Sequence, residues 1–593
     1  MSHRKLVSPH VLAVLLLAPL AVCAGTPPPT VSISSPSSGS TVSGTVTLNA
    51  NASPSVGTTI TWVQFQLDGT ALANKDTTAP YSVAWNSTLV ADGPHTLTAV
   101  ARDSLGHRRT SVAVSMTVQN NAPVQPTNAT VTVDAASQTG ILKTQLSTND
   151  VWSGMIDQAP GAQDRLNALH APLVRIHAGD DGWPAAMPEL QYNSWDLSAL
   201  DALVNNVRQS GQYPMMNIKF APDWMWTCTT LYTAGEIRDK TFQTFADYMA
   251  RIVSYYNLGE MTTESGQTIV NPAGTNNRIT FWELWNEPDL NNETPCVTSS
   301  GNGLTPSEYV TMWNAVTAKM LAIDSTLKFV GPATAGSQFG SATATGNEYV
   351  DDLMAGSNTK PSAISIHGYG YWDNSVTDQT IFDGDSTGSG GIPDILSGVA
   401  HIRSQYSAYP VYLTEVNVNA DWGNDTAQRP WGAFGAAWWA TLFSKLGPQG
   451  VDLIHQFDVI DSPQFGLLSD QTGDPNLPYW EFMALNQAFP QGSTLLSTTS
   501  SKSDIIALSA RRPDGKLSIL VVNRQVDPNT RGGPGIGANV AVTLQGITAA
   551  SITLQMIDAT TNVLSGPATQ TLPANSSPQI TFGGYGFAVL TVQ

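Results

Sequence analysis

The central part of the chain alternates short apolar runs with longer amphipathic stretches, and this alternation limits the folds that it can form. An early strand is expected near residues 140–146, and seven further runs read as strands: Leu173–His177, Pro214–Phe220, Ile279–Trp285, Lys328–Gly331, Ala363–His367, Val411–Glu415 and Asp452–Phe457. Helical periodicity lies between them, at Leu197–Ser210, Thr241–Tyr256, Pro306–Ile323, Ile395–Ser407 and Gly432–Leu446. Alternating strands and helices predict a parallel sheet. Eight such units predict a (β/α)8 TIM barrel over residues 130–490.

Both flanks of this region read as β structure, so the chain is expected to be multidomain. Residues 28–120 hold short alternating runs separated by turns that contain glycine, which predicts an immunoglobulin-like β-sandwich. Residues 121–129, with Pro123 and Pro126, read as a linker. From residue 491 to residue 593 the helical periodicity disappears and strand-like runs return, which predicts a C-terminal β-sandwich.

The N-terminal region also resembles a known type of module. The runs Ile60–Asp68 and Pro94–Asp103 are similar to those of bacterial immunoglobulin-like modules. Its large aromatic residues could form a platform for carbohydrate, but such residues more often fill the core of a sandwich. We therefore expect a core role for Trp62, Phe65, Tyr81 and Trp85.

Residues 1–24 read as a signal peptide, in which Arg4 and Lys5 precede the apolar stretch Val11–Val22. That stretch is too short to predict a stable membrane span. A lipoprotein with Cys23 as the lipidated residue is the alternative, but Val22 is an unusual residue before such a cysteine. We expect a secreted or periplasmic protein. Its formal net charge of -19 argues against a nucleic-acid partner, because phosphate contacts need clustered lysine and arginine.

Two cysteines remain after the signal peptide, Cys228 and Cys296. Both follow predicted strands and would lie in loops on one face of the barrel. Because exported proteins form disulfides, we expect a bridge between them, with two free thiols as the alternative.

Two predicted strands end in a glutamate. The fourth strand runs into Asn286-Glu287-Pro288, and it should stop there because proline cannot donate to a sheet. The seventh strand ends at Thr414-Glu415. The carboxyl ends of barrel strands meet at one mouth and carry the catalytic groups of enzymes with this fold. Paired carboxylates are the groups that hydrolyse glycosidic bonds, so we expect this site to bind a carbohydrate substrate, either a polysaccharide or an oligosaccharide.

These motifs resemble a known group of enzymes. Trp285-Asn286-Glu287-Pro288 with the later Thr414-Glu415 is similar to the glycoside hydrolases of clan A. The segment 282–290 is most similar to family 39, which contains β-xylosidases, α-L-iduronidases and some bacterial exopolysaccharide hydrolases. The segments 465–468 and 478–480 and the terminal β-sandwich also resemble that family, so the likeness extends from about residue 130 to the C-terminus.

The resemblance implies a retaining hydrolase in which Glu287 is the acid/base and Glu415 the nucleophile. Asn286 would bind the 2-hydroxyl of the sugar, Tyr369 would hold the carboxylate of Glu415, and Arg175 would lower the pKa of Glu415. His367 belongs to the His-x-Tyr pattern of the clan. The remaining candidates for substrate binding lie at or after strand ends: His177, Trp224 and Trp372.

No cofactor is expected, because the chain has neither a phosphate loop nor a dinucleotide fingerprint. The segment 383–394 matches a calcium loop imperfectly, since Thr387 stands at its fifth position and Asp394 replaces the usual glutamate at its twelfth. We favour a solvated loop there and no metal site. We expect hydrolysis of a plant or bacterial polysaccharide or its oligosaccharides. The alternatives are exo-acting β-xylosidase-like cleavage of short oligosaccharides and glycan binding by an inactive surface protein.

Overall fold

The structure is a computed structural model of the 593-residue chain. It describes residues 27–593 except 73–74, 91, 121–125, 152–153, 179–187, 190, 220, 228–235, 291–303, 337–345, 373–374, 422–424, 426, 462–464, 528–530 and 575–576. The predicted signal peptide and the predicted disulfide partners Cys228 and Cys296 lie outside the described residues. The chain forms two compact units, Met1–Ala122 and Pro123–Gln593. Within the described part of the chain, no helix is both long and apolar enough to cross a membrane.

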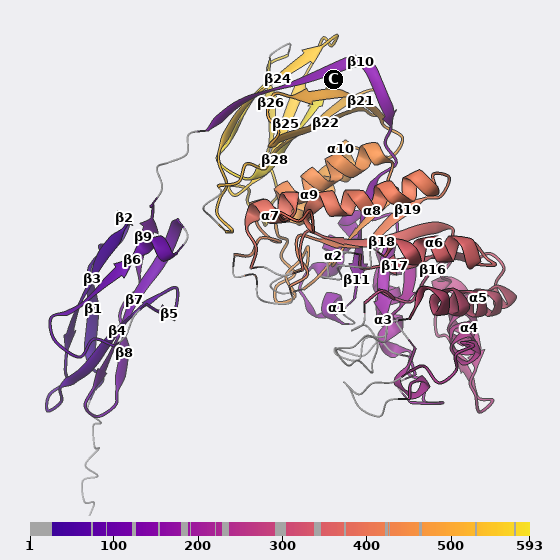
Figure 1. Ribbon diagram of the computed structural model, residues 1–593, viewed down its shortest axis with the longest axis horizontal. Coiled ribbons are helices and arrows are strands. Elements are labelled where there is room, and N and C mark those ends of the chain that lie inside the picture. The colour runs from indigo at the N-terminus through magenta and orange to yellow at the C-terminus, as the bar shows by residue number, and fades with distance from the viewer. Residues whose placement is uncertain are drawn as a thin grey trace, which may run out of the picture. The chain divides into compact units, whose positions relative to one another are not determined.

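The first unit is a sandwich of two β-sheets (Figure 1). One sheet joins β1 (Thr30–Ser35), β3 (Thr45–Ser53) and β6 (Tyr81–Asn86). The other has the order β2 (Ser40–Val42), β9 (Val114–Val118), β7 (Gly93–Asp103), β4 (Ile60–Leu67) and β5 (Thr70–Ala71), with β8 (Arg108–Thr110) on β7. The aromatic side chains of Phe65, Tyr81 and Trp85 pack in the shared apolar core, and Trp62 is also buried. The predicted core role is thus confirmed for Phe65, Tyr81 and Trp85. Trp62 lies outside this core cluster, and the cations of Lys75 and Arg108 stand over its ring.

The second unit contains a closed barrel of eight parallel strands, as the sequence predicts. In order around the barrel these are β11 (Gln145–Asp150), β12 (Val174–Ala178), β13 (Pro214–Ile218), β16 (Phe281–Leu284), β17 (Lys328–Thr334), β18 (Ala363–Tyr369), β19 (Val411–Asn417) and β20 (Leu453–Gln456). Pairing of β20 with β11 closes it. Every segment that the sequence assigned to a strand forms one, and the earliest begins a few residues later than expected.

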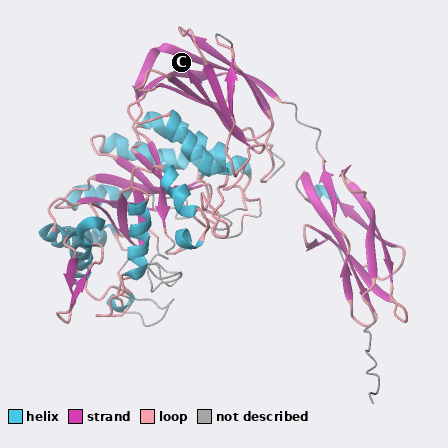
Figure 2. Cartoon of the chain, turned by 180° about the vertical axis from the view of Figure 1, so that it is seen from behind, coloured by secondary structure: helices cyan, strands magenta, loops and turns pink. Residues whose placement is uncertain are grey.

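Helices surround the barrel (Figure 2). Those that the sequence predicts are α3 (Ser198–Gln209), α4 (Gln243–Asn257), α5 (Pro306–Ile323), α8 (Gly391–Gln405) and α9 (Ala433–Leu446). The start of α5 is set by a capping box between Thr305 and Glu308, with Pro306 in the first turn. The described residues also form helices that were not predicted: α1 (Met155–Gln158), α2 (Ala162–Leu169), α6 (Asn347–Gly356), α7 (Asp378–Asp383) and α10 (Leu477–Ala488).

The C-terminal region is a nine-stranded sheet. Its order is β26 (Thr569–Leu572), β25 (Ile552–Asp558), β28 (Gly586–Val592), β23 (Leu517–Asn523), β22 (Ile505–Arg511), β21 (Thr494–Ser500), β10 (Thr127–Ile141), β24 (Ala538–Gln545) and β27 (Gln579–Phe582). Side chains from both ends of this order, such as Leu554 and Ile580, share one apolar cluster. The sheet therefore folds over on itself and encloses a sandwich core, as expected.

Strand β10 corrects the expected boundaries. Residues 127–129 were assigned to the linker and residues 130–141 to the barrel, but all belong to the C-terminal sheet. The strand pairs in parallel with β24 and antiparallel with β21. Its alternation of threonine and valine over residues 130–133 suits a half-buried strand, and Val131 and Val133 point into the sandwich core.

The sandwich and the barrel share a core through α9. This helix is apolar on all sides, and nearly all of its residues are buried. Phe434 of α9 packs against Tyr585 of the sandwich, with ring centroids 5.2 Å apart. Other side chains of α9, such as Trp438, belong to one apolar cluster with Ile364 and Leu413 of the barrel strands, so the second unit has one continuous core.

The inside of the barrel is layered. An apolar layer contains Leu173, Met215, Val330, Ala363 and Leu453. Toward the carboxyl ends of the strands, polar residues replace it. The register sets His177 beside Asn217, and Asn217 beside Glu283. The polar layer thus rests on a packed apolar floor and opens at the end of the barrel where active sites form.

Candidate functional site

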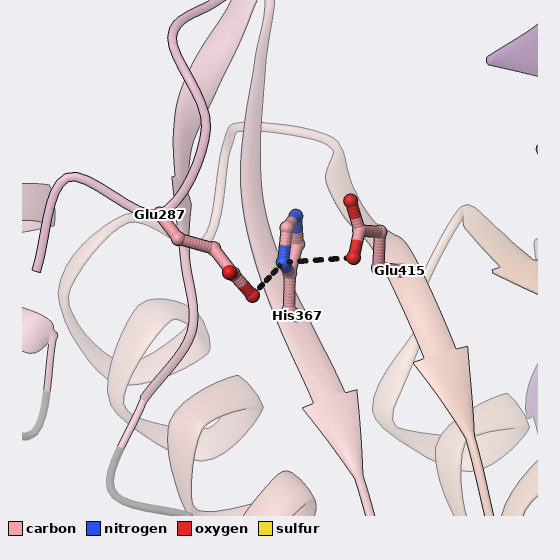
Figure 3. A group of neighbouring side chains, drawn as sticks. All are labelled: Glu287, His367 and Glu415. Atoms are coloured by element: carbon pink, nitrogen blue, oxygen red, sulfur yellow. Dashed lines mark hydrogen bonds and ion pairs between the residues drawn. The ribbon is translucent and has the colours of Figure 1, made fainter. Parts of the chain in front are cut away.

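The two predicted glutamates lie together at the mouth of the barrel. Glu287 follows β16, and Glu415 lies on β19. Both side chains are buried, and one carboxylate oxygen of each lies within 4.8 Å of the other. His367 of β18 stands between them (Figure 3). Its Nδ1 is 2.7 Å from Oε1 of Glu287 and 3.6 Å from Oε2 of Glu415.

Arg175 on β12 ties four strand ends together. Its Nε donates to Oε2 of Glu283 at 2.6 Å, and its Nη1 donates to Oε1 of Glu415 at 2.6 Å. The same Nη1 reaches Oδ1 of Asn149 at 3.1 Å, and Nη2 donates to Oδ1 of Asn286 at 2.7 Å. Arg175 and Glu283 are completely buried. One cation therefore orients two carboxylates and two amides at once.

Glu415 is held as a carboxylate by its surroundings. Burial by itself raises its pKa, but the charges of His367 and Arg175 outweigh this effect and lower the pKa of Glu415 to about 2. His177 also contributes, with its Nδ1 3.6 Å from Oε1 of Glu415. The hydroxyl of Tyr369 donates to Oε2 of Glu415 at 3.1 Å. Glu415 is thus ionised and fixed in orientation.

His367 interacts with both glutamates. Burial lowers the pKa of its imidazole, but the charges of Glu415 and Glu287 and the hydrogen bond to Glu287 raise it overall. Glu287, His367 and Glu415 each offer one atom to a cluster that could ligate a metal ion. Arg175 lies 2.6 Å from Glu415, and a cation at this place would meet that charge. The set suits proton transfer and carboxylate chemistry better than metal binding.

The backbone around Glu287 is strained. Trp285, Glu287 and Ala333 have φ values of 72°, 43° and 55°, in the left-handed region that residues other than glycine seldom adopt. Each such residue costs on the order of 1–3 kcal/mol, and it persists only where surrounding contacts hold it. The N–H of Glu287 donates to the carbonyl of Ala333 at 2.9 Å, so the ends of β16 and β17 hold each other.

The two tryptophans assigned to substrate binding lie on mouth loops, outside this cluster. Trp224 is half-buried in the turn Asp223–Met225 after β13, and its ring meets that of Tyr192 edge-on, with centroids 4.9 Å apart. Trp372 follows β18 and is 50% exposed.

The segment 383–394, which matches a calcium loop imperfectly, makes contacts within the protein. Asp383 pairs with Arg524 at 2.5 Å. In the same segment, Oδ1 of Asp385 accepts hydrogen bonds from Thr387 and Ser389. Both carboxylates thus have protein donors as partners.

Two residues that support the site were not among the predicted site residues. Nδ2 of Asn149 donates to the carbonyls of Thr414 and Gln456 at 3.1 Å, while its Oδ1 accepts from Arg175. Nδ2 of Asn217 donates to Oε2 of Glu283 at 3.2 Å. Both amides stand near the carboxyl end of a barrel strand, and this position is the signal that could have identified them.

The comparisons with known proteins support the architecture. A family model for a bacterial Ig domain matches residues 29–99, which confirms the predicted N-terminal module. No curated protein matches the chain.

Many solved structures resemble the chain, among them those of the following three proteins. A glucosidase from Croceicoccus marinus has a TM-score of 0.53 and 15% identity over 78% of this chain and 99% of its own. The GH39 enzyme from Xanthomonas axonopodis pv. citri has a TM-score of 0.52 and 15% identity, with 80% and 98% covered. A family 51 α-L-arabinofuranosidase from Bifidobacterium longum has a TM-score of 0.55 and 12% identity, with 79% and 100% covered. At these identities the likeness establishes a shared fold, and the fold that the motifs implied is confirmed.

Proposed function

We propose that the protein is a retaining glycoside hydrolase that uses Glu287 as acid/base and Glu415 as nucleophile. The observation that carries the proposal is the approach of the two carboxylates to within 4.8 Å at the mouth of the barrel. Carboxyl groups about 5 Å apart suit retention, whereas inversion needs roughly 6.5–9.5 Å so that the attacking water molecule fits between the general base and the sugar. The similar structures named as a glucosidase, a GH39 enzyme and an arabinofuranosidase are consistent with this chemistry.

The surroundings of each glutamate suit its role. The carboxylate of Glu415 attacks the anomeric carbon, the glycosidic C–O bond breaks, and the leaving oxygen takes the proton of Glu287. Water then attacks the glycosyl-enzyme and gives its proton to Glu287. Arg175 and Tyr369 keep Glu415 ionised for the first step. Asn286, held by Arg175, lies next to the acid/base and would bind the 2-hydroxyl of the sugar.

A polymeric substrate is favoured over a short oligosaccharide. Aromatic side chains stand on mouth loops from both sides of the barrel, with Tyr192 and Trp224 after β12 and β13, and Trp372 after β18. Strands β12 and β18 are four positions apart in either direction around the barrel, so their loops face each other. A chain of sugars could contact both. The predicted export of the protein and its bacterial Ig domain agree with a polysaccharide outside the cell.

A screen of aryl glycosides and polysaccharides tests the proposal. Wild-type protein should cleave at least one substrate with retained anomeric configuration, which NMR of the first product shows. Glu415→Gln should lower turnover by about 10⁴-fold or more while the protein stays folded, which circular dichroism shows. Sodium azide should restore activity to Glu287→Ala, because azide can attack the glycosyl-enzyme without a general base. Inverted product, or full activity in Glu415→Gln, would rule the proposal out. Binding of polysaccharide without cleavage would favour an inactive glycan-binding protein.

A further inference from the structure

Asp289, two residues after Glu287, makes contacts that the chemistry above does not use. Its side chain is half-buried. Oδ1 accepts the N–H of Ala335 at 2.9 Å, and Oδ2 accepts the N–H of Gly336 at 2.9 Å. Both donors lie directly after β17. Burial raises the pKa of Asp289, and these two hydrogen bonds oppose that rise.

These hydrogen bonds and one made by Glu287 itself attach the segment 287–289 to the end of β17, and we call this set of contacts the bracket. On one side of Glu287, its own N–H donates to the carbonyl of Ala333. On the other side, Asp289 accepts hydrogen bonds from the N–H groups of Ala335 and Gly336, which follow β17. The N–H of Ala333 in turn donates to Oγ of Ser365 on β18 at 3.1 Å. The segment that carries Glu287 is therefore fastened at two points to β17, which is itself fastened to β18.

The bracket coincides with the strained backbone. Glu287 and Ala333 both lie in the left-handed region, and each belongs to one side of the bracket. Residues in that region relax once the contacts around them are removed. A shift of the Glu287 backbone would move its carboxyl group away from the leaving oxygen of a bound glycoside.

We infer that Asp289 is a positioning residue, which holds the acid/base Glu287 at its working place by clamping the end of β17. The inference rests on the proposed function. It assigns Asp289 no contact with the substrate. Its loss should impair proton donation by Glu287 and leave nucleophilic attack by Glu415 intact, because Glu415 is held by Arg175 and Tyr369.

Leaving groups of different acidity separate these two effects. A phenyl glycoside needs a proton from Glu287 when its C–O bond breaks, whereas a 2,4-dinitrophenyl glycoside departs as a stable anion without one. The value of kcat/KM reports the steps up to formation of the glycosyl-enzyme. The ratio of the two kcat/KM values, measured on one preparation, does not depend on the fraction of protein that is folded.

The experiment compares Asp289→Asn with wild type on both aryl glycosides of the sugar that wild type cleaves best. Asparagine can accept from one N–H, but its amide group opposes the other. We expect kcat/KM to fall about 100-fold for the phenyl glycoside, since a displacement of roughly 1 Å costs this much. The fall for the dinitrophenyl glycoside should be several-fold at most. The limb of the pH profile that reports Glu287 should also move in Asp289→Asn.

Asp239→Asn is a matched control. Asp239 likewise accepts two backbone N–H groups, those of Thr241 and Thr244 at 2.9 Å, but it caps the region before α4. Asp239→Asn should leave kcat/KM unchanged for both the phenyl and the dinitrophenyl glycoside. Equal falls on both substrates in Asp289→Asn, or no fall, would overturn the positioning role. If Glu287→Ala itself shows no dependence on the leaving group, the proposed acid/base is wrong and the role of Asp289 falls with it.

Discussion

Replacement of Arg175 by methionine probes the charge balance of the site. Methionine keeps part of the volume but removes the cation that lies 2.6 Å from both Glu283 and Glu415. Removal of one partner from a buried ion pair costs about 3–5 kcal/mol, because the other charge stays buried without compensation. Two carboxylates lose their partner here. We therefore expect the free energy of unfolding at pH 7 to fall by about 4 kcal/mol or more.

The size of this loss should depend on pH. In wild type the folded pKa of Glu415 is about 2, below the ordinary value of 4.5. A depressed carboxyl pKa stabilises the fold above pH 4.5, and the contribution disappears as the pH falls from 4.5 through 2. At about 1.4 kcal/mol per pH unit it amounts to about 3 kcal/mol. Loss of Arg175 raises the pKa of Glu415 toward its ordinary value. The free energy of unfolding of Arg175→Met should therefore fall furthest below that of wild type at pH 7, and by less at pH 3.

Urea unfolding followed by tryptophan fluorescence measures the effect at both pH values, since Trp282 and Trp285 are buried on the strand that leads to the site. Arg278→Met is the control. It removes the same side chain from a partly exposed pair with Asp324, at 2.7 Å, and should cost about 1 kcal/mol or less. A deficit in Arg175→Met no larger than that of the control, or one equal at pH 7 and pH 3, would refute the electrostatic argument.

Three further changes test separate parts of the molecule. Tyr369→Phe removes one donor to the Glu415 carboxylate and should lower kcat by about 10- to 100-fold, as expected for a hydrogen bond to a charged group; an unchanged kcat would show that Tyr369 does not act on the nucleophile. Trp372→Ala should raise KM for a polysaccharide severalfold without a shift in thermal midpoint, because the ring is 50% exposed; if only small aryl glycosides are affected, the ring does not bind the polymer. Phe65→Ala should destabilise the N-terminal unit by about 3–5 kcal/mol, because Phe65 is buried in its core, and leave hydrolysis by the second unit unchanged; calorimetry resolves the two units, and a loss of activity would contradict their independence.

Local patterns in the chain were enough to predict the barrel. Seven of its strands are apolar runs next to helical periodicity, and these signals depend on residues only a few positions apart. The ends of two strands carried Glu287 and Glu415, because proline stops a strand and the carboxyl ends of parallel strands meet at one mouth. Helices with weak or short periodicity, such as α7 and α10, escaped prediction since their positions are set by packing against the sandwich and the mouth loops.

Pairing between distant segments could not be predicted in the same way. Strand β10 lies between β21 and β24, and its partners are several hundred residues away in the chain. Its own sequence indicates a strand but not the sheet that it joins, because alternation of apolar residues specifies a buried face and not a neighbour. The boundary between linker, barrel and sandwich was misplaced for this reason.

The sequence alone determined which residue types stand at the strand ends, and therefore the chemistry that this chain could perform. Only the tertiary structure decided how these residues meet. Closure of the barrel brings Asn149, Glu283 and Glu415, from three strands, onto the guanidinium of Arg175 on a fourth. Contacts between strand ends hold Glu287 in a backbone conformation that its local sequence disfavours. Such arrangements depend on the register of strands far apart in the chain, because local free-energy preferences are small compared with the burial and hydrogen bonding that the closed barrel provides.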